Sequence, residues 1–273
     1  MQREIGSNFW VDPAQDVVPV RSFDPACMSI HGSDLAATSS GRGALALILE
    51  TIAQRFPGQE KRALLPSFTC HTVIAPFLAA DYSIEYLPVD EDLRTQPAHL
   101  EAAIRRTGPT VVLLHRYFGF DTLPGAAQVV REAERQGVAV IEDRTQCLYS
   151  GIAPLPSSFC MGSLRKWAGL PDGGFAVCCD GRLSMHPDGY DKDLEQAKLA
   201  ASYAKYRYLF ENIGEKSAFL DLYRRAEGIL DQETAVYAIS PAAVGIQTSL
   251  DLSALSRHLS LIHISEPTRR SYI

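Results

Sequence analysis

The stretch Val138-Ala139-Val140-Ile141-Glu142-Asp143 decides the fold of this chain. Four consecutive apolar residues followed by two carboxylates are typical of a strand that is buried on both faces and ends at a polar edge. Residues 125–136 have a helical pattern, and the glycine at position 137 is a residue that commonly ends a helix. A helix followed directly by a buried strand predicts one repeat of an α/β fold.

The same alternation of strand and helix recurs along the chain. We expect buried strands at residues 62–66, 84–90, 110–115 and 174–179, and helices at residues 43–55, 72–80, 97–106 and 191–213. Strands that are apolar throughout and alternate with helices predict a three-layer α/β sandwich with a mostly parallel central sheet. Ligands of such sheets bind at the carboxyl ends of the strands, which is where His115 and Asp143 fall.

Composition narrows the class of protein. The chain has 273 residues, 46% of them hydrophobic, so it can bury a large core. A net charge of −6 without a Lys/Arg-rich run argues against nucleic-acid binding. Without a long apolar run or a signal-peptide core, we expect a cytoplasmic protein with no membrane contact. The six cysteines show no zinc-ligand spacing, so no metal site is expected, and those at 147, 160, 178 and 179 are interpreted as buried apolar residues in a reducing compartment.

A lysine in an apolar setting is the second informative feature. Lys166 lies in Ser163-Leu164-Arg165-Lys166-Trp167, and burial there would favour its neutral, nucleophilic amine. Taken alone, a lysine is more often a surface charge and an aspartate after a strand is often a helix cap. Together, Lys166 and Asp143 are the pair that pyridoxal 5'-phosphate requires: a Schiff-base lysine, and a carboxylate that keeps the pyridine nitrogen protonated. We therefore interpret both as catalytic and cofactor-binding residues.

A phosphate site is indicated by the run Ser39-Ser40-Gly41-Arg42-Gly43, which directly precedes an apolar helix. Backbone amides at a helix N-terminus that are not covered by side chains bind anions. The alternative is that Ser40 is an ordinary N-cap. Ser163 could place its hydroxyl on the same phosphate, and Gln146 could donate to the ring hydroxyl of the cofactor.

In this order the motifs resemble those of the DegT-type sugar aminotransferases, within the fold type I pyridoxal phosphate enzymes. The resemblance covers about residues 4–258. The matching stretches are residues 4–10, 40–45, 66–69, 86–90, 142–146, 163–167, 172–174 and 240–246. The stretches that contain Asp143 and Lys166 are the specific ones.

The resemblance implies a role for each matching residue. Lys166 would be the Schiff-base lysine, Asp143 the partner of the pyridine nitrogen and Gln146 a contact of the ring hydroxyl. The phosphate would be held by Ser163 and by the backbone amides of Arg42 and Gly43. Many members carry an aromatic residue that stacks on the ring after the position of Thr69. This chain has Cys70 and His71 there, so His71 is the candidate for that contact.

The resemblance also implies an activity, substrates and an assembly. Members that have histidine in place of the lysine catalyse dehydration, so Lys166 favours a transaminase. The expected donor is an amino acid, glutamate in the first instance, and the expected acceptor is a nucleotide-linked keto-sugar. A homodimer is expected, because a second subunit usually completes such active sites. The alternatives are another fold type I reaction, of the lyase or desulfurase type, and a non-catalytic module that senses the cofactor.

The predicted domain organisation has three parts. Residues 1–35 form an N-terminal segment, and residues 36–258 form the large domain that binds pyridoxal phosphate. The large domain would end in the connection to a small domain that is largely missing. Residues 259–273 resemble the translation of a transposon-end sequencing adapter, the alternative being an amphipathic C-terminal extension. We expect the chain that ends here to be poorly soluble or inactive by itself.

Overall fold

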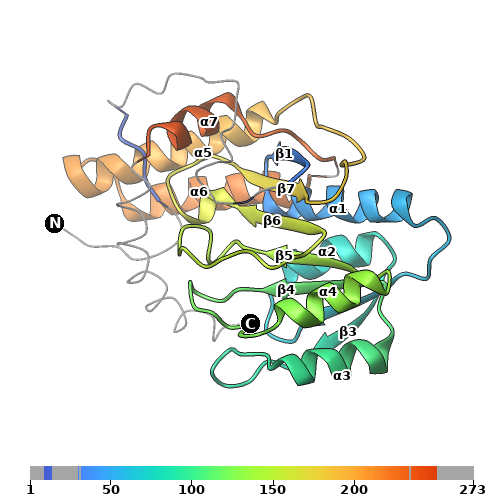
Figure 1. Ribbon diagram of the computed structural model, residues 1–273. Helices are drawn as coiled ribbons and strands as arrows, with labels where there is room; N and C mark the ends of the chain where they lie inside the picture. The colour runs from blue at the N-terminus through green and yellow to red at the C-terminus, as the bar shows by residue number, and fades with distance from the viewer. Residues whose placement is uncertain (1–8, 14–29, 31, 234, 251–273) are drawn as a thin grey trace.

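The computed structural model describes residues 9–13, 30, 32–233 and 235–250. The predicted adapter-derived tail and most of the predicted N-terminal segment lie outside this described part. Figure 1 shows a central sheet between layers of helices, with further helices beside one end of the sheet. No helix in the described part is long and apolar enough to cross a membrane.

The sheet has seven strands in the order β1-β7-β6-β5-β4-β2-β3. Strands β6, β5, β4, β2 and β3 run parallel, whereas β7 is antiparallel to both of its neighbours. The predicted three-layer α/β fold with a mostly parallel sheet is therefore confirmed. The strands are β1 (Asp34–Thr38), β2 (Arg62–Pro66), β3 (Ser83–Leu87), β4 (Val111–His115), β5 (Ala139–Asp143), β6 (Phe159–Ser163) and β7 (Gly174–Cys178).

The first five helices along the chain agree with the predicted ones in place, with shifted ends, whereas those at residues 216–231 and 241–248 were not predicted. They are α1 (Gly41–Arg55), α2 (His71–Ala79), α3 (Pro97–Thr107), α4 (Ala127–Arg135), α5 (Lys192–Tyr206), α6 (Lys216–Asp231) and α7 (Pro241–Thr248). The single helix predicted over 191–213 is wrong at its end. Its α-helical part stops at Tyr206 and passes into the π-helical turn η3 (Arg207–Glu211), after which Asn212 takes a left-handed conformation that ends the helix.

Strand β6 was not predicted from the sequence, and neither was strand β1, which precedes α1. The sequence of β1, Asp-Leu-Ala-Ala-Thr, is short and not strongly apolar, so periodicity gave no signal. It lies at the edge of the sheet and pairs with β7, which holds it in register from Asp34↔Cys178 to Thr38↔Gly174, and its last residue also forms an isolated antiparallel bridge with Ala238. The pairing partner, and not the local pattern, makes this segment a strand.

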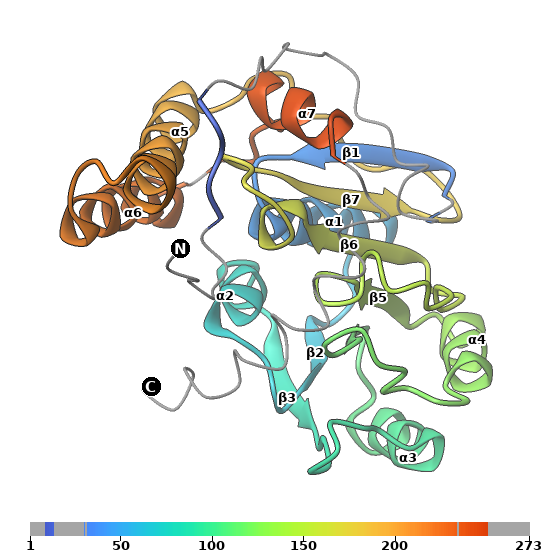
Figure 2. The same cartoon turned by 90° about the vertical axis from the view of Figure 1, so that its left-hand side faces the viewer.

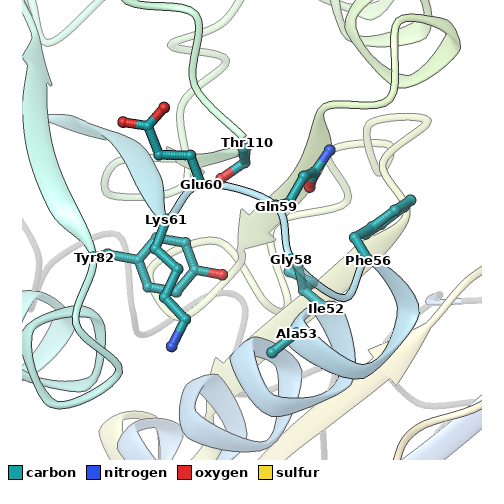
Figure 3. Close-up of a pocket in the computed structure, with 9 residues that line it drawn as sticks. All are labelled: Ile52, Ala53, Phe56, Gly58, Gln59, Glu60, Lys61, Tyr82 and Thr110. Carbon is teal, nitrogen blue, oxygen red and sulfur yellow. The ribbon is translucent and has the colours of Figure 1, made fainter.

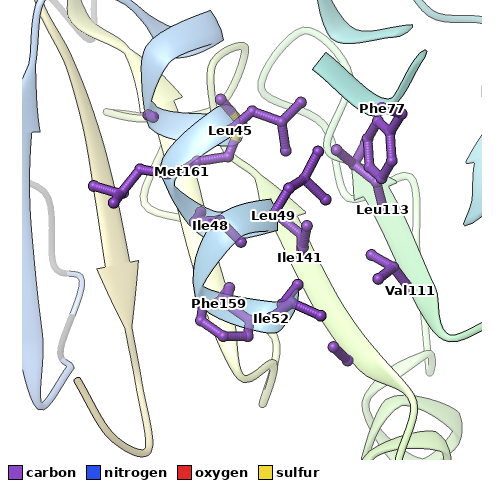
Figure 4. Close-up of a cluster of buried hydrophobic side chains, with 14 of the residues drawn as sticks. Leu45, Ile48, Leu49, Ile52, Phe77, Val111, Leu113, Ile141, Phe159 and Met161 are labelled. Carbon is purple, nitrogen blue, oxygen red and sulfur yellow. The ribbon is translucent and has the colours of Figure 1, made fainter. Parts of the chain in front are cut away.

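Each face of the sheet is covered by its own helices. On one face α1 buries Leu45, Ile48 and Ile52 against the strand residues Ile141 and Phe159, and α2 adds Phe77 to the same cluster (Figure 4). On the other face α3 and α4 pack on the central strands, and α7 packs on the β6 and β7 end. Successive side chains of a strand point to opposite faces. In β5, Asp143 therefore shares the α1 face with Ile141, and Glu142 points to the α4 face.

Helices α5 and α6 form a pair of their own, which lies beside the β1 end of the sheet in Figure 2. Phe219 and Tyr223 of α6 are buried against Ala201 of α5. The side chain of Asp191 caps α5 by accepting hydrogen bonds from the amides of Asp193 and Leu194. This helical pair reaches the core next to the turn that follows β6.

Candidate active site

Asp143 is the last residue of β5, and its carboxylate is buried, with 4% of the side chain exposed. Oδ2 lies 3.1 Å from Nδ1 of His115, and Oδ1 accepts a hydrogen bond of 2.8 Å from the amide of Thr145. Burial by itself would raise the pKa of Asp143. The charge and hydrogen bond of His115, with the hydrogen bonds of Thr145, outweigh burial and lower the pKa. The carboxylate thus stays ionised and suits a protonated ring nitrogen.

His115 ends the neighbouring strand β4 and is the register partner of Asp143. Its Nε2 lies 2.7 Å from the hydroxyl of Thr69, in the loop between β2 and α2. Its ring packs on Tyr117 at 5.5 Å between centroids, and the hydroxyl of Tyr117 donates a 2.7 Å hydrogen bond to the carbonyl of Phe68. The loops after β2 and β4 are therefore joined at the carboxyl edge of the sheet, and both support the position of Asp143.

Lys166 lies on a 3-10 turn, η2 (Leu164–Lys166), directly after the carboxyl end of β6. Thr145 joins this segment to the loop after β5. Its Oγ1 accepts a 3.1 Å hydrogen bond from the amide of Ser163, and its carbonyl accepts a 2.5 Å hydrogen bond from Nε1 of Trp167. Since β5 and β6 are parallel neighbours, Lys166 and Asp143 lie at the same edge of the sheet. Their convergence on one cofactor ring stays a prediction.

The N-terminus of α1 also lies at this edge, next to Ser163. A Cβ added at Gly41 would be 3.2 Å from Cβ of Ser163, and one added at Gly174 would be 2.4 Å from the carbonyl carbon of Ser40. Only glycine allows the close approach at position 174, whereas a Cβ at position 41 would require Ser163 to shift slightly. The first turn of a helix leaves amides without intrahelical partners, and the start of α1 lies beside the segment that carries the buried Ser163. The arrangement is a cradle that suits a phosphate.

Of the predicted cofactor contacts, the amide of Gly43 has another partner in this structure, while the Arg42 side chain and the Gln146 amide oxygen have partners that leave their predicted contacts untested. The amide of Gly43 donates to Oγ of Ser40 at 3.0 Å, so Ser40 acts as an N-cap. The side chain of Arg42 points to α6, where it donates to Oδ1 of Asp231 at 2.8 Å and to the carbonyl of Leu230. Oε1 of Gln146 accepts a 3.2 Å hydrogen bond from the amide of Phe118.

His71 is the first residue of α2 and is exposed. It makes none of the ring contacts found within the described part of the chain. The structure therefore brings together Asp143, Ser163, the Lys166 turn and the start of α1. It does not show a contact between His71 and that group.

The supporting residues His115, Thr69 and Thr145 were not predicted as parts of the site. A signal existed for His115, because it ends an apolar strand as Asp143 does. No signal existed for the two threonines, whose contacts depend on how loops from different strands meet.

A buried ion network lies behind the site, on the α4 face of the sheet. Oε1 of Glu142 accepts from Nε of Arg116 at 3.2 Å and from Nη1 of Arg144 at 3.1 Å, while Oε2 accepts from the amide of Leu155. All three side chains are almost fully buried. The network anchors the loops after β4 and β5, and these are the loops that carry the residues around Asp143.

The surface hollow shown in Figure 3 lies elsewhere. Its lining includes Phe56 after α1, Lys61 before β2, Tyr82 before β3 and Thr110 before β4. These residues mark the amino ends of the parallel strands, which is the edge opposite to Asp143. The candidate site therefore rests on its buried polar groups and not on this hollow.

In sequence comparisons, no family model and no curated protein matches this chain. Solved structures do match it. 3-amino-5-hydroxybenzoic acid synthase has a TM-score of 0.51 and 14% identity, over 85% of this chain and 54% of that chain. DesI, in the presence of its TDP-sugar product, has a TM-score of 0.51 and 18% identity, over 85% of this chain and 51% of that chain. DesV of S. venezuelae, in complex with a ketimine intermediate, has a TM-score of 0.50 and 18% identity, over 86% and 54%.

At these identities the likeness shows the fold alone. The fold is that of the large domain of fold type I pyridoxal phosphate enzymes, and the predicted resemblance to the DegT-type sugar aminotransferases is confirmed at this level. The chain spans about half the length of the chains that it matches.

Proposed function

We propose that this chain is the cofactor-binding part of a pyridoxal-phosphate-dependent aminotransferase. The observation that carries the proposal is the buried carboxylate of Asp143, which His115 and Thr145 keep ionised at the edge that also carries Lys166. When bound, pyridoxal phosphate supplies an electron-accepting ring that stabilises negative charge on the donor's α-carbon. Asp143 would keep a proton on the ring nitrogen, which makes the ring a better electron acceptor.

The other residues have roles that follow from their positions. The Lys166 amine would attach the cofactor and, once released by the donor, would hold and move the proton at the donor's α-carbon. Ser163 and the backbone amide of Arg42 would bind the phosphate, joined by the amide of Gly43 once the phosphate replaces Oγ of Ser40 as its acceptor. The glycines at positions 41 and 174 keep this cradle narrow, since any larger residue would separate α1 from the strands.

The proposed substrates are an amino acid, glutamate in the first instance, and a nucleotide-linked keto-sugar. The amino group leaves the donor, which is oxidised to a 2-oxo acid, and the acceptor ketone is reduced to an amine. DesI, whose structure was solved with its TDP-sugar product, supports a sugar nucleotide as the acceptor. We also propose a homodimer for the whole protein, because a second subunit would complete the site.

The attachment of the cofactor to Lys166 can be tested without turnover. The chain is titrated with pyridoxal phosphate, the visible absorption band of the lysine-bound form is recorded, and the complex is reduced with borohydride and mapped by peptide mass spectrometry. We expect the label on Lys166 and no band in Lys166→Ala. The matched control Lys192→Ala, an exposed lysine at the start of α5, should behave like the wild type. A band that persists in Lys166→Ala refutes the assignment.

The reaction class is tested by the products. Glutamate-dependent release of 2-oxoglutarate supports a transaminase. Release of sulfur or of an aldehyde from the donor instead points to a desulfurase or a lyase. Cofactor binding without reaction toward any amino donor points to a module that senses the cofactor.

A further inference from the structure

The two sides of the phosphate cradle, the first turn of α1 and the segment after β6, are both tied to one helix, α6. On the first side, the side chain of Arg42 donates to Oδ1 of Asp231 at 2.8 Å and to the carbonyl of Leu230 at 3.3 Å. On the second side, Nη1 of Arg165 in the turn η2 donates to Oε1 of Glu227 at 2.9 Å. The helix α6 therefore holds both segments that we expect to enclose the phosphate.

The spacing of the two carboxylates on α6 suits this double contact. Glu227 and Asp231 are four residues apart in the last turns of the helix, so they lie on the same face. Each pairs with an arginine from a different side of the cradle. The two sides also approach each other closely, since a Cβ added at Gly41 would be 3.2 Å from Cβ of Ser163. The pair of carboxylates thus spans the line along which α1 and the segment after β6 meet.

The two ion pairs differ in burial. The side chains of Arg165 and Glu227 are 21% and 37% exposed, and Glu227 also pairs with the buried Lys198 of α5. The side chain of Arg42 is 23% exposed, but that of Asp231 is 65% exposed. Solvent screens the second pair more strongly, so we expect Glu227 to contribute more than Asp231.

The chain that follows α6 continues along the first turn of α1. Oγ of Ser39 donates to Oε2 of Glu233 at 3.4 Å. Further on, Cγ1 of Val236 lies 3.7 Å from the position of a Cβ added at Gly43. The contact between the end of α6 and the start of α1 is therefore continuous and does not depend on the arginine alone.

We propose that Glu227 and Asp231 are positioning residues that form a two-point clamp, the α6 clamp, across the phosphate cradle. The clamp fixes the spacing between the first turn of α1 and Ser163, so that an amide of one and the hydroxyl of the other reach the same phosphate. Hydrogen bonds weaken steeply when donor and acceptor move apart, so a looser cradle binds phosphate less tightly. The inference rests on the proposed function, because the phosphate is that of the cofactor.

The charge of the clamp gives the test a distinctive sign. Glu227 and Asp231 are both negative and lie beside the start of α1 or the segment after β6. By charge alone, neutralising either carboxylate would favour a phosphate dianion nearby and would free an arginine to bind it. If the carboxylates act as a clamp, neutralising them weakens phosphate binding instead.

The experiment compares two ligands that differ by the phosphate. Wild type, Asp231→Asn, Glu227→Gln and the double variant are titrated by calorimetry with pyridoxal phosphate and with pyridoxal, which lacks the phosphate. Asp221→Asn is the matched control, because Asp221 is an exposed carboxylate of α6 that pairs with Arg224 of the same helix. Thermal unfolding of each variant verifies that it is folded.

We expect the affinity for pyridoxal phosphate to fall by about 3-fold in Asp231→Asn and by about 10-fold in Glu227→Gln, with the larger loss at the less exposed pair. The affinity for pyridoxal should stay the same, and Asp221→Asn should bind both ligands as the wild type does. Glu227→Gln leaves Lys198 without its carboxylate, so Asp231→Asn alone decides the test if Glu227→Gln does not fold.

Three results overturn the inference. The first is an unchanged or higher affinity of the folded clamp variants for pyridoxal phosphate. The second is an equal loss of affinity for pyridoxal, which would show a general loosening of the site. The third is a wild type that binds pyridoxal phosphate no better than pyridoxal, which would remove the cradle as well.

Failure of the proposed function looks different from failure of the clamp. If the affinities for pyridoxal phosphate fall as expected but borohydride reduction places no cofactor on Lys166, the clamp stands and the proposed function fails. If Lys166 is labelled and the clamp variants bind as the wild type does, the proposed function stands and the clamp fails.

Discussion

Replacing His115 by leucine tests how the candidate site keeps Asp143 ionised. Nδ1 of His115 and Oδ2 of Asp143 are 3.1 Å apart, and the two side chains are 7% and 4% exposed. At this separation, with an effective dielectric constant of about 20, the attraction of two unit charges is about 5 kcal/mol before desolvation. Removing one partner from such a buried pair costs about 3 kcal/mol or more, because the other charge stays buried without compensation.

The pH dependence gives the sharper signature. In the wild type the pKa of Asp143 is lowered on folding, so its stabilising contribution is present above the unfolded value of about 4 and is lost as pH falls through the folded-state pKa. Without His115, burial is opposed only by Thr145, and the pKa of Asp143 should rise. The stability deficit of His115→Leu should then be about 3 kcal/mol at pH 7 and should shrink as the pH falls and Asp143 becomes protonated in the variant.

Urea unfolding of both proteins at several pH values measures this difference. His99→Leu, a change at an exposed histidine on α3, is the control and should have little effect at any pH. Asp143→Asn and the double variant complete a thermodynamic cycle, in which we expect a coupling of about 2 kcal/mol between His115 and Asp143. A deficit that is constant with pH, together with no coupling, would show that His115 contributes packing alone and would refute the electrostatic reasoning.

Two further predictions concern the segments that frame the site. Gly174→Ala would place a Cβ 2.4 Å from the carbonyl carbon of Ser40, so we expect the free energy of unfolding in urea to fall by about 3 kcal/mol. The control Gly228→Ala in α6, with nothing within 4 Å of the added Cβ, should raise it by about 0.5–1 kcal/mol. Equal effects of the two changes would contradict the close contact. Burial raises the pKa of Asp172 to about 7, above its unfolded value, so the contribution of Asp172 to stability is lost as pH rises from about 4 to 7. Asp172→Asn should therefore stabilise the protein by about 2–4 kcal/mol at pH 8 and hardly at all at pH 4. An effect that does not depend on pH would refute this reasoning.

The sequence by itself determined the layers of the fold, and it predicted Asp143 and Lys166 as the central residues of the candidate site. Runs such as Val111–His115 and Ala139–Asp143 are apolar on both faces, and this local pattern is enough to indicate buried parallel strands between helices. Polar residues at the ends of such strands must meet at one edge of the sheet, since parallel strands share their direction. The pattern of strands and helices therefore places His115 and Asp143 at one edge, whereas the place of Lys166 there follows from β6, which the pattern did not indicate.

Only the tertiary structure decided how these residues are supported. His115, Thr69 and Thr145 reach Asp143 and the Lys166 segment through contacts between different loops. The position of Lys198 follows from the packing of α5 against α6 and of both against the turn after β6. The physical reason is that the periodicity of a sequence indicates which face of a helix or strand is buried. A hydrogen bond or ion pair between distant segments depends instead on the paths of loops and the placement of helices, and no local sequence pattern encodes these.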